Sequence, residues 1–336
     1  MKKLTRRALL VAGICCALGI VMLLTGLSLG ARHSFYILNN RVYFYEDSSY
    51  VAVEETVAAF RELSVDISFA DVSVELSDHY GYEYGFLDER VTPEVTLDGD
   101  RLTVRQKHGS APLHIGFSAK SNYLELYLPK EAALTLADIR LASGKLICSG
   151  LTADELKLKL DFGNMTLSSL TAKAADIDLA SGSLKLSDSA MDSLRYDVDF
   201  GSSEFRGFSG GAVVINSASS GIRLVDSSFD SLSIGQDFGD ITATGLTTGA
   251  LRLSQSSGSS ELTGSIRGQT DIKVDFGSCK IITDLAESAY NFDLNADFGS
   301  VKVNGKKQSD RFLTENSAEN AIRAAISSGS VTVTTN

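Results

Sequence analysis

The sequence lacks tryptophan entirely and holds only three prolines, four cysteines and four histidines in 336 residues. Beyond the first 31 residues only Cys148 and Cys279 remain, which excludes a framework of disulfides. The histidines do not have the spacing of metal ligands, so we predict no metal site and no other cofactor. They are His33, His79, His108 and His114.

Positive charge is also scarce in most of the chain. Four of the 31 basic residues precede residue 8, and no acidic residue lies before residue 31. The remainder therefore carries 27 basic against 42 acidic residues, a formal net charge of −15. Such a surface repels phosphate backbones, and no basic stripe is present, so nucleic-acid binding is excluded.

An uncharged apolar run is present at residues 8–31, directly after four basic residues. A helix of this length measures about 35 Å and is long enough to cross a hydrocarbon core of about 30 Å. The positive-inside tendency predicts a cytoplasmic N-terminus and an extracytoplasmic remainder. A cleaved signal peptide is the alternative, with Ser28-Leu29-Gly30 as its cleavage site, but the apolar run exceeds the usual length. We expect an uncleaved single-pass anchor and localisation at the cell membrane.

The triplet Asp-Phe-Gly occurs five times, beginning at Asp161, Asp199, Asp237, Asp275 and Asp297. A protein kinase has this triplet once, among other signature segments that are missing here. Glycine or serine recurs every 19 residues from Gly144 to Gly277, and Asp-Phe-Gly alternates with Ala-Ser-Gly or Ser-Ser-Gly. A fixed period of this kind is typical of a repeat architecture.

Each 19-residue unit has the alternating apolar pattern of β-strands on both sides of its glycine. The two alternations do not join in phase, and a glycine at the break makes a bend inexpensive. The units therefore predict an all-β fold, a single-chain β-solenoid of about 19-residue coils preceded by one transmembrane helix.

The facing of the side chains follows from this alternation. We expect Phe162, Phe200, Phe238 and Phe276 to point inward on alternate coils, with Ser181, Ser219 and Ser257 between them. The aspartates of the triplets face outward and accept backbone N–H groups at the corner. Cys148 and Cys279 fall on inward positions as core fillers. Ser217, Gln236 and Gln255 are also inward, near Ser203 and Ser260, and must then form hydrogen bonds along the stack.

The chain divides into three predicted regions. Residues 1–31 form the cytoplasmic tail and anchor, 32–62 connect the membrane to the solenoid, and 63–336 form the solenoid domain. Within the domain, 63–138 hold irregular capping coils and a hairpin around Asp98-Gly99, 139–303 hold the regular coils, and 304–336 hold an insertion, loop or short helix, and a closing strand. Val65, Ile67, Phe69, Val72 and Val74 place a first, capping coil in the same register, with Ala70 in the glycine position.

We find no candidate catalytic, cofactor-binding or metal-binding residue. No serine lies in a Gly-x-Ser-x-Gly elbow, and no glycine-rich loop leads into a helix. Aspartates two coils apart stand about 10 Å from each other, too far to share a calcium ion. The acidic, tyrosine-rich run at residues 80–90 indicates a solvated loop, or alternatively a surface that contacts a partner.

The segment "YLPK" at residues 127–130, followed by Ser-Gly and Asp-Phe-Gly at 19-residue spacing, resembles a bacterial family described as putative adhesins. The family is also known as a β-strand-repeat domain of unknown function. The resemblance covers about four-fifths of the chain and implies a solenoid outside the cell membrane. It implies no catalytic residues, and some members are linked to envelope-stress responses.

Three functions remain open. The first is a non-enzymatic surface scaffold, adhesin-like, that binds an unknown protein or glycan at the cell envelope. The second is a membrane-tethered sensor or regulator of envelope stress, and the third is a polysaccharide-acting β-helix enzyme. A flat apolar or aromatic outer patch would indicate binding. A groove with converging carboxylates and an arginine would indicate a lyase. We expect that the protein is not an enzyme.

Overall fold

The computed structural model describes residues 12–13, 15–16, 18–22, 25–26, 28, 35–38, 41–44, 50–106, 113–115 and 121–336. The chain forms two compact units. The first comprises residues 1–51, 86–92 and 108–121, and the second comprises 52–85, 93–107 and 122–336.

The smaller unit contains a three-stranded antiparallel sheet of β1 (Phe35–Leu38), β2 (Arg41–Phe44) and β9 (Leu113–Ile115). Most of the predicted anchor lies outside the described residues. Those that are described between 12 and 28 are helical. Within the described part of the chain, no helix is long and apolar enough to cross a membrane.

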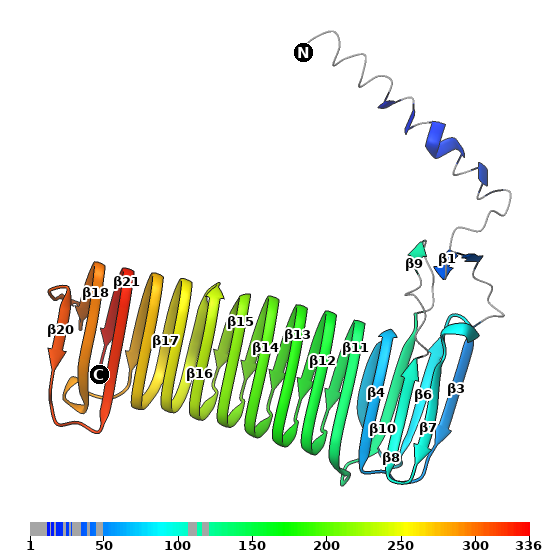
Figure 1. Cartoon of the computed structure of the whole chain (residues 1–336), viewed down its shortest axis with the longest axis horizontal. Coiled ribbons are helices and arrows are strands. Elements are labelled where there is room, and N and C mark those ends of the chain that lie inside the picture. The colour runs from blue at the N-terminus through cyan, green and yellow to red at the C-terminus, as the bar shows by residue number, and fades with distance from the viewer. Residues whose placement is uncertain are drawn as a thin grey trace. The chain divides into compact units, whose positions relative to one another are not determined.

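The larger unit is a stack of coils whose strands pair in parallel, as Figure 1 shows. The regular coils are β11 (Ala133–Ser149), β12 (Thr152–Ser168), β13 (Thr171–Ser187), β14 (Ala190–Arg206), β15 (Ser209–Val225), β16 (Ser228–Phe238) and β17 (Ile241–Thr283). Each residue of a coil pairs with the residue 19 positions later, as Leu141 pairs with Leu160 and Leu160 with Leu179. The predicted 19-residue β-solenoid is confirmed, because the strands from β11 to β17 pair in parallel with this register.

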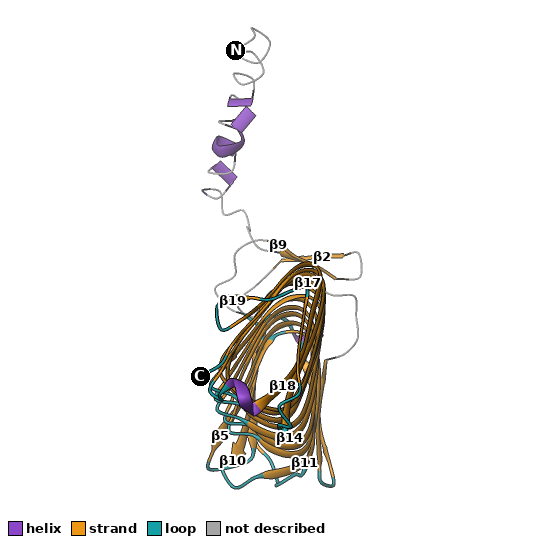
Figure 2. Ribbon diagram, turned by 90° about the vertical axis from the view of Figure 1, so that its left-hand side faces the viewer, coloured by secondary structure: helices purple, strands orange, loops and turns teal. Residues whose placement is uncertain are grey.

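The coils have a flattened cross-section with two narrow edges, which Figure 2 shows end-on. At one edge the glycines of the repeat, such as Gly163 and Gly182, adopt φ values near +140°. At the other edge a residue in the left-handed region begins the return strand, as Ser169 does with φ 55°. Leucine, isoleucine and valine from both broad faces fill the narrow space between them.

One facing prediction is wrong. Phe162, Phe200, Phe238 and Phe276 do not point inward but are exposed, and so is Phe298. The inward alternation ends three residues before the glycine, at Leu160 in one coil, and resumes two residues after it, at Met165. The four residues between them turn around the edge, so the phenylalanine lies on the convex side of the corner. We call these five residues, Phe162, Phe200, Phe238, Phe276 and Phe298, the phenylalanine column.

The predicted polar ladder inside the coils is confirmed. The Gln255 side-chain amide donates to Gln236 Oε1 over 3.0 Å and to the Gly239 carbonyl over 2.7 Å, and Gln255 Oε1 accepts from Ser260 over 2.7 Å. Ser217 bonds to Ser220 over 2.7 Å, and Tyr196 bonds to Ser203 over 2.7 Å. These bonds supply the partners that buried polar groups require.

The N-terminal end of the stack folds back on itself. The coil of β4 (Glu62–Phe69) and β5 (Asp71–Ser77) lies beside β11, as predicted, but it is not terminal. Beyond it lies a coil of β8 (Arg101–Gln106) and β10 (Tyr123–Pro129). The end is covered by β7 (Pro93–Asp98), β6 (Gly81–Phe86) and β3 (Val51–Thr56).

Two expectations for this end are resolved by these pairings. The hairpin around Asp98-Gly99 is confirmed, because β7 and β8 pair antiparallel and Gly99 has φ 57°. The solvated loop expected at residues 80–90 is wrong, because most of that run forms β6 and the 3-10 turn η2 (Glu89–Val91). Tyr82 and Tyr84 occupy alternate positions of β6, which pairs antiparallel with β10 and also pairs with β3.

The C-terminal end contains a strand insertion. The strand β21 (Asn320–Thr334) pairs in parallel with the last coil of β17 on one side and with β18 (Tyr290–Val303) on the other. It therefore does not close the stack, contrary to expectation. The outer edge of β18 pairs instead with β19 (Lys306–Lys307) and β20 (Arg311–Thr314), antiparallel, in the segment expected to be a loop or short helix. The 3-10 turn η3 (Glu287–Ala289) precedes β18.

Candidate binding surface

The most unusual surface of the solenoid is the phenylalanine column, whose five side chains are 60–81% exposed. Other aromatic rings are packed inside the same coils, where Phe205 contacts Tyr196 and Phe208 at centroid distances of 5.7 Å and 5.9 Å. The interior therefore accommodates aromatic rings, so a lack of space in the core does not explain why the phenylalanines of the column are exposed. Large exposed apolar groups in a regular row are typical of an interaction surface.

The column alternates strictly with serine in space. The sheet register gives the order Phe69, Ser143, Phe162, Ser181, Phe200, Ser219, Phe238, Ser257, Phe276, Ser328, Phe298. At two points in this order the neighbours are distant in the sequence: Phe69 beside Ser143, and Ser328 between Phe276 and Phe298. The alternation is thus maintained by the fold and not only by the local repeat.

The glycines allow this edge to stack closely. A Cβ on Gly182 would lie 1.6 Å from the Gly163 carbonyl oxygen, and one on Gly201 would lie 1.7 Å from that of Gly182. At these glycines no side chain fits between successive backbones. The coil of β15 has Ser220 at this position instead, without a positive φ. The phenylalanine before each glycine is therefore displayed on a tightly packed and regular backbone.

A carboxylate stands beside each ring of the column, two positions before the glycine. Asp161 and Asp275 lie 3.9 Å and 3.8 Å from Lys159 and Lys273. Asp199 and Asp237, at the middle of the column, have no ion pair or hydrogen bond to any residue in the described part of the chain. Their oxygens are available to accept hydrogen bonds from a bound molecule.

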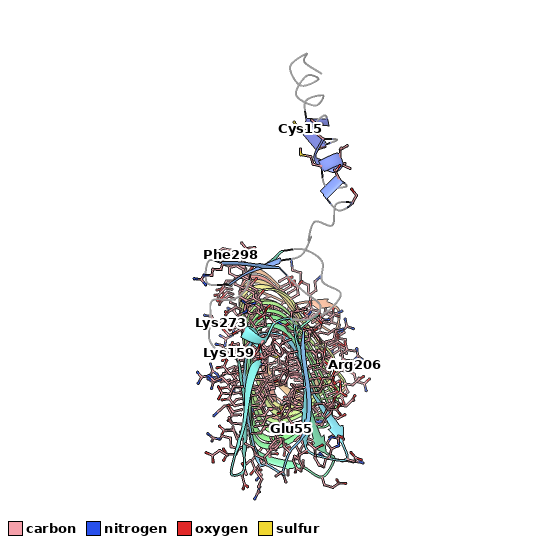
Figure 3. The ribbon with its side chains drawn as sticks, turned by 90° about the vertical axis from the view of Figure 1, so that its right-hand side faces the viewer. Cys15, Glu55, Lys159, Arg206, Lys273 and Phe298 are labelled. Carbon is pink, nitrogen blue, oxygen red and sulfur yellow. The ribbon has the colours of Figure 1, made fainter. Side chains whose placement is uncertain are left out.

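Shallow hollows flank the middle of the column on both broad faces. One of about 490 Å³ lies beside Asp199 and Asp237, where Ala218, Gly235 and Ser256 leave space. One of about 310 Å³ on the other face is lined by Ser202, Gly221 and Asp240, with Lys185, Glu204 and Arg223 around it. Figure 3 shows the edge and the two faces, with Phe298 at the narrow edge, Lys159 and Lys273 on one face and Arg206 on the other.

A third hollow, of about 530 Å³, lies toward the C-terminal end on the same face as Lys273. Two ion pairs involve charged side chains of its lining. Arg323 lies 3.5 Å from Asp271, and Arg311 lies 3.1 Å from Asp293. Exposed ion pairs of this kind are typical of a solvated surface. Asp271 and Asp293, the two carboxylates that line this hollow, are both paired with arginines.

Tyrosines and carboxylates meet near the N-terminal end of the stack. Tyr82 donates to Glu55, Tyr123 donates to Glu83 over 2.5 Å, and Tyr127 donates to Glu125 over 2.8 Å. Burial, followed by the hydrogen bond to a glutamate, raises the pKa of Tyr82 and of Tyr127. These phenols therefore stay protonated at neutral pH and hold the end strands together.

His79 is the one histidine whose side chain the structure describes. His79 contacts Asp78 over 2.7 Å, whereas His33 and His108 lie outside the described residues and the backbone of His114 belongs to β9. Among the residues that the structure describes, no group of three or more histidine, cysteine, aspartate or glutamate side chains could hold a metal ion. Cys148 and Cys279 are buried, as predicted, and burial raises the pKa of each thiol to about 12.

The sequence pattern identifies the phenylalanines and aspartates of the triplets, but simple alternation predicts that the rings lie in the core and not on a surface. A usable signal was present in the phase break at each glycine. The phenylalanine lies inside that break, where simple alternation no longer determines facing.

One family model and several solved structures match this chain. A model of the Toastrack DUF4097 family matches residues 60–259. Among solved structures, a putative adhesin from Parabacteroides distasonis ATCC 8503 is similar, with 13% identity, 86% of this chain and 98% of that chain covered and a TM-score of 0.36. A putative lipid binding protein from the same organism has the same values.

A putative cell adhesion protein from Clostridium sporogenes ATCC 15579 has 10% identity and a TM-score of 0.22, with 85% of this chain and all of that chain covered. Among curated proteins, none matches this chain.

Proposed function

Because the chain belongs to the Toastrack DUF4097 family, a repeat family without an assigned chemistry, we propose that it acts as a non-enzymatic surface scaffold. It is adhesin-like and binds protein or glycan partners at the bacterial envelope. The observation that carries this proposal is the exposed phenylalanine column on a rigid stack of coils. A sensor or a polysaccharide-acting enzyme would not by itself require such a row.

The proposed location is the outer side of the cell membrane. The uncharged run at residues 8–31 and the four basic residues before it support a single membrane-spanning anchor with a cytoplasmic N-terminus. The solenoid then faces the envelope, and the membrane is the first partner of the chain. Protease added to intact protoplasts should digest the solenoid and leave only a small protected fragment.

The binding role is tested by changing every phenylalanine of the column to serine in the full-length chain. Serine is native on the alternate coils, so the variant should keep the fold. The wild-type chain, inserted in nanodiscs of neutral lipid, should sediment with purified envelope material, and the variant should lose at least about tenfold in affinity.

The control changes exposed apolar residues away from the column. Ile147→Ser and Leu313→Ser remove side chains that are 42% and 55% exposed and should leave sedimentation unchanged. Equal binding by the wild type and the column variant, or no binding by either, would overturn the proposal.

A further inference from the structure

The column presents separate aromatic platforms at one constant interval. Paired strands lie 4.7–4.9 Å apart, so rings on alternate coils stand about 10 Å from each other. The serines between them keep the rings from merging into one apolar patch of the kind that proteins or bilayers contact. A linear polymer that shows an apolar ring face at the same interval fits this spacing.

An extended β-1,4-linked polysaccharide is such a polymer. Its pyranose rings present C–H groups on their faces, and the chain advances by a similar length with each disaccharide. The equatorial hydroxyl groups point sideways from these faces. A chain laid along the solenoid axis therefore places an apolar face over every phenylalanine and hydroxyl groups over both flanks.

The flanks of the column carry matching polar groups. The unpartnered carboxylates of Asp199 and Asp237 line the hollow on one face, and Ser202 and Asp240 line the hollow on the other. A carboxylate accepts hydrogen bonds from hydroxyl groups more strongly than a neutral acceptor does. The middle of the column therefore offers stacking from the edge and acceptors from both sides.

The charge pattern selects a neutral chain. An aspartate stands two positions before the glycine at each of the five rings, and the chain beyond residue 31 has a net charge of −15. An anionic polymer or anionic bilayer is repelled by this row. A second copy would bring two aspartate rows together, and insertion of the rings into lipid would desolvate the carboxylates beside them.

We propose that the phenylalanine column binds a neutral β-1,4-linked polysaccharide chain, with one disaccharide for every two coils. The inference rests on the proposed function and names the class of its partner. Phe200 and Phe238 form the centre of the site, because hollows flank the column there on both broad faces. From Phe162 to Phe298 the register has eight coil-to-coil steps, which corresponds to four disaccharides and about 38 Å.

The test measures binding of the full-length chain in neutral-lipid nanodiscs to cello-oligosaccharides and chito-oligosaccharides of increasing length. Affinity should rise with each added disaccharide up to the decasaccharide, which is long enough to place one sugar face over each of the five rings, and then level off. Phe238→Ser should weaken octasaccharide binding by about tenfold, the effect of losing about 1.4 kcal/mol. Asp237→Asn should weaken it less, and Leu313→Ser should leave it unchanged.

Carboxymethylated cellulose provides the charged counterpart of the same backbone and should bind more weakly than the neutral chain. Binding without length dependence, or binding that survives Phe238→Ser, would overturn the inference. So would column-dependent binding to phosphatidylglycerol vesicles, or a dimer that the serine variant abolishes, because each assigns the surface to another occupant.

The outcome also separates this inference from the proposed function. If envelope material binds through the column but neither oligosaccharide series does, the scaffold function stands and the glycan assignment fails. If no envelope material binds through the column, both fail.

Discussion

Phe276 pairs in register with Ser328 and not with Phe298. The sequence order alone would place the two phenylalanine coils side by side, since Phe298 follows in the next triplet. The insertion of β21 between them restores the Phe–Ser–Phe order of the rest of the edge. The same order at Phe69, Ser143 and Phe162 is again made by strands that are not consecutive. The spacing of the rings is therefore a property of the assembled sheet.

The exposure of the column predicts a small effect on stability. Phe238→Ser should change the free energy of unfolding by no more than about 0.5 kcal/mol, because most of the ring is already exposed to solvent in the folded chain. Phe205→Ser removes a fully buried ring that contacts Tyr196 and Phe208 and should cost at least about 3 kcal/mol. Urea unfolding followed by circular dichroism measures both. Similar losses in the two variants would show that the column contributes to the core.

The close stacking at the glycine edge predicts that Gly182 tolerates no side chain. In Gly182→Ala the new Cβ meets the Gly163 carbonyl oxygen at 1.6 Å, and the backbone at φ +144° disfavours any L residue. We expect a loss of about 3 kcal/mol in the free energy of unfolding. Gly221→Ala is the matched control, because a Cβ there has no neighbour within 4 Å. Thermal unfolding measures the melting temperature of both variants. A Gly182→Ala protein that is as stable as the wild type would contradict the close stacking at this edge.

The polar ladder predicts coupling between its two glutamines. Gln255→Leu leaves Gln236 Oε1, the Gly239 carbonyl and the Ser260 hydroxyl without these partners and should cost about 2–4 kcal/mol. Adding Gln236→Leu should cost less than its effect in the wild-type chain, because the shared bond is already lost. A double-mutant cycle in urea measures the interaction energy, expected at about 1 kcal/mol. Strict additivity would mean that the ladder does not act as a unit.

The buried thiols predict a loss of stability at high pH. Burial raises the pKa of Cys148 and of Cys279 from 9.0 to about 12. The folded chain then holds two protons that the unfolded chain releases, so their stabilising effect is complete below pH 9 and declines as the pH rises toward 12. Each thiol should contribute a slope of about 1.4 kcal/mol per pH unit within that window.

The comparison with a Cys148→Ala, Cys279→Ala variant isolates this effect. The variant starts less stable because of two small cavities, but its stability should fall less steeply between pH 9 and pH 11 by the slope of two thiols. Buried Tyr196, whose pKa burial also raises, is present in both chains and cancels. Identical slopes would show that the thiols ionise without unfolding.

The period of the repeat determined most of the fold from the sequence. The 19-residue register, the inward leucines and cysteines, and the hydrogen-bonded glutamines all follow from residues that alternate within a straight strand. The facing of Phe162 does not follow from this alternation, because four consecutive positions, 161–164, turn around the edge. A corner residue faces in or out according to the backbone path, which the local pattern does not encode.

The two ends were harder to predict for a different reason. The strands β6, β7, β8 and β10 cover one end by folding back, and β21 enters the stack at the other, so their neighbours are distant in sequence. Gly329 occupies the glycine position of its coil, but it follows its register partner Gly277 by 52 residues and not by a multiple of 19. The same holds for the candidate binding surface, because the spacing between Phe276 and Phe298 depends on the insertion of β21 between their coils.

The position of β21 predicts an unusual sensitivity to C-terminal truncation. Removal of residues 320–336 takes away an interior coil, so the backbone groups of the last β17 coil and of β18 that pair with it lose their partners together. Each unpaired buried backbone group carries a large desolvation cost. We expect the truncated chain to lose cooperative thermal unfolding and to become sensitive to protease after β17. Removal of the last two residues alone, which follow Thr334 at the end of β21, is the control and should leave the melting transition in place. A truncated chain with an unchanged transition would require the outer coils to close the gap, which would also bring Phe276 next to Phe298.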